Sequence, residues 1–138
     1  MPILGTPYER GNSDVIVSRA YAASLGEGLA VSETEVNGVL TMNVGASPIG
    51  VSGRMGLVAG DEIKSGLKVY VQAETEDEEI TIGSQVYVVA ATGKFTQTKG
   101  SGPENVPLNA TARTKIVDCI DSKGNKIKGF AIDFPNGL

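Results

Sequence analysis

The chain has 138 residues, of which 41% are hydrophobic and 20% charged, and this balance suits a single packed domain. It contains no histidine and one cysteine, Cys119, which removes histidine-based nucleophile pairs, an intrachain disulfide and a cysteine-type zinc site. The net charge of −4 argues against nucleic acid as a partner. The sequence contains no run of about 18 apolar residues, so it predicts no membrane-spanning helix.

The first 13 residues differ in composition from the rest and predict an extended N-terminal arm. Prolines and glycines discourage helix and strand there, while apolar side chains lie between them. We expect this arm either to be disordered or to lie on a neighbouring subunit or partner. The residues expected to make those contacts are Pro2, Ile3, Leu4, Pro7 and Tyr8. Residues 14–138 are expected to form one β domain, and the N-terminus lacks the basic and apolar regions of a signal peptide.

From residue 14 onward the hydrophobic periodicity is mostly two, which predicts a mainly-β chain folded as a small barrel or sandwich (tulip-like). The strand-like runs are 14–22, 29–31, 39–42, 68–73, 85–91, 115–120 and 126–133. Asn37-Gly38 predicts a hairpin with a type I′ turn, because that turn needs positive φ at both central residues. A second hairpin turn is expected at 121–125 and a long loop at 96–109. The best helix candidate, 19–25, is short.

An internal repeat with an offset of 17 relates residues 62–75 to residues 79–92, with 8 of 14 positions identical. Each copy reads as a glycine turn followed by a strand. The repeat therefore predicts two consecutive strands of one sheet, with Gly66 and Gly83 at positive φ.

The charges are unevenly placed along the chain. Five carboxylates occupy residues 74–79, which predicts a solvated loop or, alternatively, a weak cation site. Residues 110–130 carry five basic side chains against two acidic ones. In a homo-oligomer, Glu76 and Glu78 could pair with Lys126 and Lys128 of a neighbour, and the alternative is that both faces are independently solvated.

No motif of catalysis or cofactor binding stands out. The serines have no base to activate them, no Walker A loop is present, and Cys119 lies in an apolar run that predicts a buried side chain. We therefore expect neither an enzyme nor a cofactor or metal.

The stretch from Ile80 to Thr96, which reads ITIGSQVYVVAATGKFT, resembles a segment of tailed-bacteriophage capsid decoration (cement) proteins. The resemblance implies a non-enzymatic homotrimer in the virion, assembled in the host cytoplasm. It would bind the outer capsid surface and clamp adjacent copies of a major capsid protein with the HK97-type fold. The alternatives are a phage tail or baseplate β module and a carbohydrate-binding β domain. The second alternative is disfavoured by 5% aromatic residues and no tryptophan.

Overall fold

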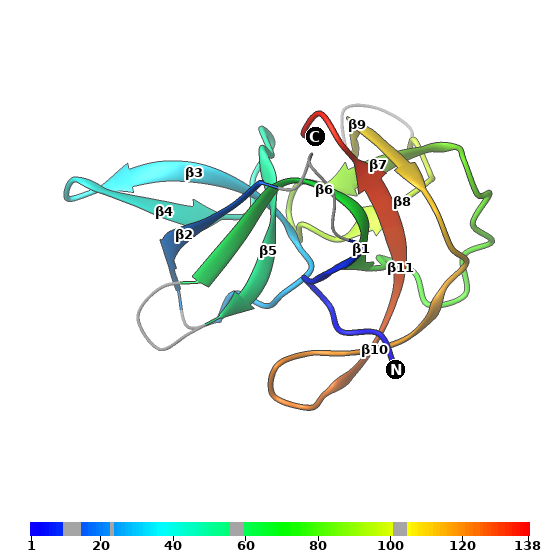
Figure 1. The fold of residues 1–138 in the computed structure, drawn as a ribbon. Coiled ribbons are helices and arrows are strands. Elements are labelled where there is room, and N and C mark those ends of the chain that lie inside the picture. The colour runs from blue at the N-terminus through cyan, green and yellow to red at the C-terminus, as the bar shows by residue number, and fades with distance from the viewer. Residues whose placement is uncertain (10–14, 23, 56–59, 101–104) are drawn as a thin grey trace.

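The computed structural model describes residues 1–9, 15–22, 24–55, 60–100 and 105–138, and these form an all-β fold without a helix (Figure 1). The strands are β1 (Pro7–Glu9), β2 (Val15–Tyr21), β3 (Ala30–Val36), β4 (Val39–Asn43), β5 (Gly50–Met55), β6 (Gly60–Gln72), β7 (Gln85–Val89), β8 (Phe95–Thr96), β9 (Asn105–Ala112), β10 (Val117–Ile120) and β11 (Lys126–Phe134). The mainly-β prediction is confirmed. The helix candidate 19–25 is wrong, because its first residues continue the alternating strand β2.

Two rings of strands share β6, the longest strand. In the N-terminal ring, β2 pairs with β4, β4 with β3, β3 with β5, β5 with β6, and β6 closes the ring on β2. Residues 60–65 of β6 make the strand pairs of this ring. Figure 1 shows it on the left, with the β3–β4 hairpin projecting beyond it.

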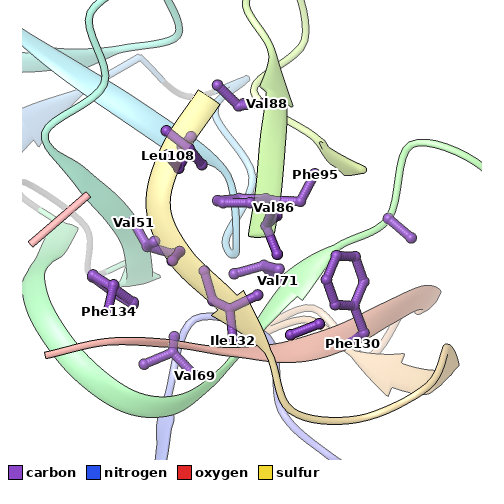
Figure 2. Packing of buried hydrophobic residues seen from close by; sticks show 14 of the residues in the cluster. Val51, Val69, Val71, Val86, Val88, Phe95, Leu108, Phe130, Ile132 and Phe134 are labelled. Atoms are coloured by element: carbon purple, nitrogen blue, oxygen red, sulfur yellow. The ribbon is translucent and has the colours of Figure 1, made fainter. Parts of the chain in front are cut away.

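The C-terminal ring uses residues 66–72 of β6, followed in space by β11, β9, β7 and β8. A bridge between Ala73 and Phe95 closes it. Figure 2 shows the apolar core, which lies mainly in this half of the molecule and reaches Val51 of β5 in the N-terminal ring. Its largest side chains are Phe95, Phe130, Phe134, Ile132 and Leu108.

The first residues of the chain are part of the domain. Leu4 is fully buried against Tyr70, Cys119 and Ala131, and its backbone N–H donates to the carbonyl of Ile120. Further along, β1 pairs with β6. The separate arm expected for residues 1–13 is therefore not observed for residues 1–9, because the domain offers Leu4 an apolar site. Residues 10–13 lie outside the described part of the chain.

Four strands fall where the sequence predicted none: β1, β5, β8 and β9. β5 was missed because its residues are mostly small or polar, and β9 occupies part of the expected loop 96–109. Pro107 argued against a strand, but its side chain is exposed in β9 while Leu108 and Ala110 point inward. The predicted 37–38 turn is confirmed, with φ values of 51° and 82°.

The two copies of the repeat belong to β6 and β7, in one sheet but not side by side, since β11 and β9 lie between them. Gly83 has the predicted positive φ, 87°, in the turn before β7. Gly66 does not, because it continues β6 opposite Phe134. The positive φ of the first copy occurs instead at Lys68, beside a β-bulge.

Candidate interaction surface

The turn at residues 81–84 holds one exposed apolar side chain on a rigid frame. Gln97 clamps the turn, because its side-chain amide accepts from the Thr81 N–H at 2.7 Å and donates to the Thr81 and Ser84 carbonyls at 2.8 and 3.2 Å. The Gly83 N–H donates to the carbonyl of Ala112 at 2.8 Å. Ile82 is 55% exposed on this turn and is therefore a pre-organised apolar contact point.

Glu78 supports that frame from the acidic run. Its carboxylate accepts from the hydroxyl of Thr96, from the Gln97 N–H at 3.0 Å and from the Thr98 hydroxyl at 3.2 Å. These bonds fix the segment that carries the clamping side chain of Gln97. Glu78 therefore has an internal role, which differs from the inter-subunit pairing expected for it.

The other predicted charge-pairing residues are only partly available. Lys128 pairs with Asp118 of its own chain at 2.7 Å. That hydrogen bond is the main reason why the pKa of Lys128 is raised, and the charge of Glu76 adds to the rise. Lys126 is exposed and forms no ion pair with a described residue. The acidic run at residues 74–79 and the β10–β11 hairpin thus already influence each other within one molecule.

The predicted N-terminal contact residues are split between surface and interior. Pro2 is half-buried and Ile3 is 36% exposed, but Leu4 has no exposed surface and is unavailable to a partner. Pro7 and Tyr8 lie in β1, and their side chains are outside the described part of the structure.

The tip of the β3–β4 hairpin is a second exposed apolar feature, which the sequence prediction of the hairpin did not recognise as a surface. Val36 and Val39 are each 51% exposed and face each other across the Asn37-Gly38 turn. Leu40 follows at 43% exposure. The local signal was the apolar residues on both sides of the turn, Val36 before it and Val39 and Leu40 after it, and they mark the tip as a contact surface.

An ionic cluster ties three strands of the N-terminal ring together. Arg19 of β2 and Lys64 of β6 both bind the carboxylate of Glu33 on β3, the arginine at 2.8 Å. Lys64 also lies 2.5 Å from Glu62, whose side chain is completely buried. Neither oxygen of Glu62 accepts a hydrogen bond of good geometry from a described residue. Such buried acids sometimes mark catalytic sites, so the surroundings of this one decide its role.

The pKa values in the cluster diverge for physical reasons. The pKa of Glu33 falls to about 2, mainly because Glu33 accepts a hydrogen bond from Lys64, and Arg19 lowers this pKa as well. Burial raises the pKa of Glu62, and the carboxyl of Glu33 raises it further. Gly50 lies directly against Glu62, since a Cβ added there would meet the Glu62 Cγ at 2.9 Å. Glu62 is therefore closely packed, which fits a structural role for the cluster.

A separate depression of about 320 Å³ lies where β2 and β4 meet the loop after β7. Its lining is mainly apolar, with Leu25, Leu29, Met42 and Val44, and it contains no titratable side chain. Elsewhere, burial raises the pKa of the Cys119 thiol to about 11, so the thiol stays protonated at neutral pH. Within the described ranges, no three acidic or cysteine side chains gather in a way that could hold a metal ion.

Comparison with known proteins adds no assignment. No protein-family model matches the chain, and no curated protein matches it. Over the part of the chain that the structure describes, no helix is long and apolar enough to cross a membrane.

Proposed function

We propose that this chain is a capsid decoration protein, which binds the outer surface of a phage head as a homotrimer and clamps adjacent major capsid protein subunits. The observation that carries the proposal is the stretch from Ile80 to Thr96, which resembles the corresponding segment of cement proteins. This stretch includes β7 and β8 and the rigid turn that exposes Ile82. The role requires contact area and persistence and no titratable catalyst.

Ile82 is the side chain of this segment that we assign to the capsid contact. Among the large hydrophobic side chains of the described residues, only Met1 is more exposed than Ile82. Because Gln97 and Ala112 hold the turn, little conformational entropy is lost when it docks. Three such contacts on one trimer would raise the avidity for a shell that repeats the same site.

The test is co-sedimentation with empty, expanded heads of the phage whose genome encodes the chain. The wild-type protein is expected to co-sediment at micromolar concentration, and Ile82→Asp is expected to reduce its apparent affinity by at least about tenfold, which corresponds to 1.4 kcal/mol. Ile49→Asp is the matched control, because Ile49 is also exposed, at 43%, but belongs to the N-terminal half.

Two results would count against the proposal. If the wild-type protein does not co-sediment with expanded heads, the capsid role is wrong. If Ile82→Asp and Ile49→Asp bind as well as wild type, the capsid contact lies elsewhere on the molecule. A melting temperature close to wild type in both variants is expected, since both side chains are exposed.

A further inference from the structure

Two hairpins at different ends of the molecule carry the same arrangement of one apolar and one charged side chain. On the β3–β4 hairpin, Glu35 lies directly across from Leu40. On the β10–β11 hairpin, Lys126 lies directly across from Ile120. Directly opposed residues of an antiparallel pair point to the same face, so each hairpin presents an apolar group beside a charge.

The two pairs have opposite charges, and among the described residues neither charge forms an ion pair. In the N-terminal ring, Arg19 and Lys64 are both bound to Glu33, and no ion pair joins Glu35 to a described residue. On the other hairpin, Asp118 is bound to Lys128. The pKa of Asp118 is lowered mainly by its hydrogen bond to Lys128, and the charge of Lys126 makes the smallest contribution. Glu35 and Lys126 therefore remain available for a partner.

Both surfaces include an exposed apolar side chain. Leu40 is 43% exposed on the face that carries Glu35, while Val36 and Val39 of the tip point to the opposite face. Ile120 is partly exposed and is bridged to Ile3, which is 36% exposed. The side of β3 away from β4 has no strand partner beyond Val31 among the described residues. An open strand edge beside an apolar tip favours association.

One molecule cannot bring its own two surfaces together. Figure 1 shows the tip of the β3–β4 hairpin projecting on the left and the β10–β11 hairpin at the bottom, on different sides of the molecule. The complementary surface for each hairpin must therefore come from another molecule.

We propose that the chain associates with a second copy of itself head to tail, with Leu40 and Glu35 of one molecule against Ile120 and Lys126 of the next. Such a contact joins two different surfaces, so it either closes into a ring or continues as a chain of subunits. The apolar pair supplies contact area and the charge pair sets the register. The inference rests on the self-association in the proposed function and not on capsid binding.

The experiment is a charge swap followed by light scattering after size-exclusion chromatography. Wild-type protein is expected to have a mass of more than one chain at micromolar concentration. Glu35→Lys and Lys126→Glu are each expected to weaken self-association by at least about tenfold, because like charges then oppose each other. The double variant Glu35→Lys/Lys126→Glu is expected to recover most of the association. Lys99→Glu, which changes an exposed charge after β8 and outside both hairpins, is the control and should not change the mass.

The outcomes separate this inference from the capsid role. A wild-type mass of one chain at roughly 100 µM would overturn the inference, even if the protein still co-sediments with heads. A multimer that neither single variant weakens would place the subunit contact elsewhere and leave self-association itself intact. Ile82→Asp reports on capsid binding alone and is expected to keep the wild-type mass. Far-UV circular dichroism of each single variant checks that the loss of mass is not a loss of fold.

Discussion

The two rings that share β6 are held together by different physical interactions. The C-terminal ring contributes most of a continuous apolar core, with Phe130 and Ile132 of β11 packed among the side chains of the neighbouring strands, and Val51 of the N-terminal ring joins the same core. The N-terminal ring is tied across its strands by an ionic cluster that includes the completely buried Glu62. Apolar burial stabilises at any pH, whereas a buried carboxylate depends on its partners. The comparison indicates that the N-terminal ring is the part whose stability responds to charge.

Truncation of the apolar core is expected to have the largest effect. Phe130→Ala should lower the free energy of unfolding by about 3–5 kcal/mol, because it removes a fully buried ring and leaves a cavity. Denaturant unfolding measures the change. Val39→Ala on the exposed hairpin tip is the contrasting variant, and it is expected to change stability by less than about 0.5 kcal/mol. Equal losses in both variants would contradict a stability concentrated in the C-terminal core.

Removal of one partner from the ionic cluster is expected to have an intermediate effect that depends on pH. Lys64→Met should destabilise the protein by about 1–3 kcal/mol, because it leaves the buried carboxylate of Glu62 without its polar partner. Burial already raises the pKa of Glu62 above its usual 4.5, and loss of Lys64 raises that pKa further. Stability linked to a raised acid pKa is full below the unfolded value of 4.5 and falls as pH rises through the folded value.

The variant Lys64→Met is therefore expected to lose more stability at pH 8 than at pH 5, as measured by denaturant unfolding at both values. The double variant Glu62→Gln/Lys64→Met removes the charge that was left alone and should recover much of the loss. A Lys64→Met loss that is identical at both pH values, or that the double variant does not reduce, would show that Lys64 acts through packing of its aliphatic stem.

The same comparison explains which features the sequence could predict. The Asn37-Gly38 turn was predictable from its sequence, whereas the alternating strand β9 was not predicted. The first is specified by two adjacent residues that accept positive φ, while the second contains Pro107 and was read as loop. Local chemistry correctly predicted the positive φ of Gly38 and Gly83 but not the extended conformation of Gly66. It predicted strands poorly where pairing with β11 and β7, rather than strand propensity, stabilises the extended chain.

The candidate interaction surfaces were less predictable than the strands. Ile82 stood inside a recognised motif, but only the bonds from Gln97, 15 positions later, reveal that its turn is rigid. The ionic cluster joins residues of three separate strands, so no local pattern marks it. Leu4 was read correctly as an apolar side chain that needs a surface. Its partner turned out to be its own domain, where Gly28 and Gly129 leave space for it.

The smallest expected effect tests whether the two rings unfold together. Gly38 in the N-terminal ring and Gly83 in the C-terminal half have φ values of 82° and 87°, and a Cβ added at either would meet nothing within 4 Å. Gly→Ala at each position therefore introduces the same backbone strain, roughly 1–2 kcal/mol, without a steric clash.

Equal losses of global stability would indicate one cooperative unit. We expect the Gly38→Ala loss to be the smaller, because a projecting hairpin can open locally before the apolar core unfolds. Hydrogen exchange of the β3 and β9 amides measures the same difference directly, and faster exchange in β9 than in β3 would reverse the assignment of the more labile ring.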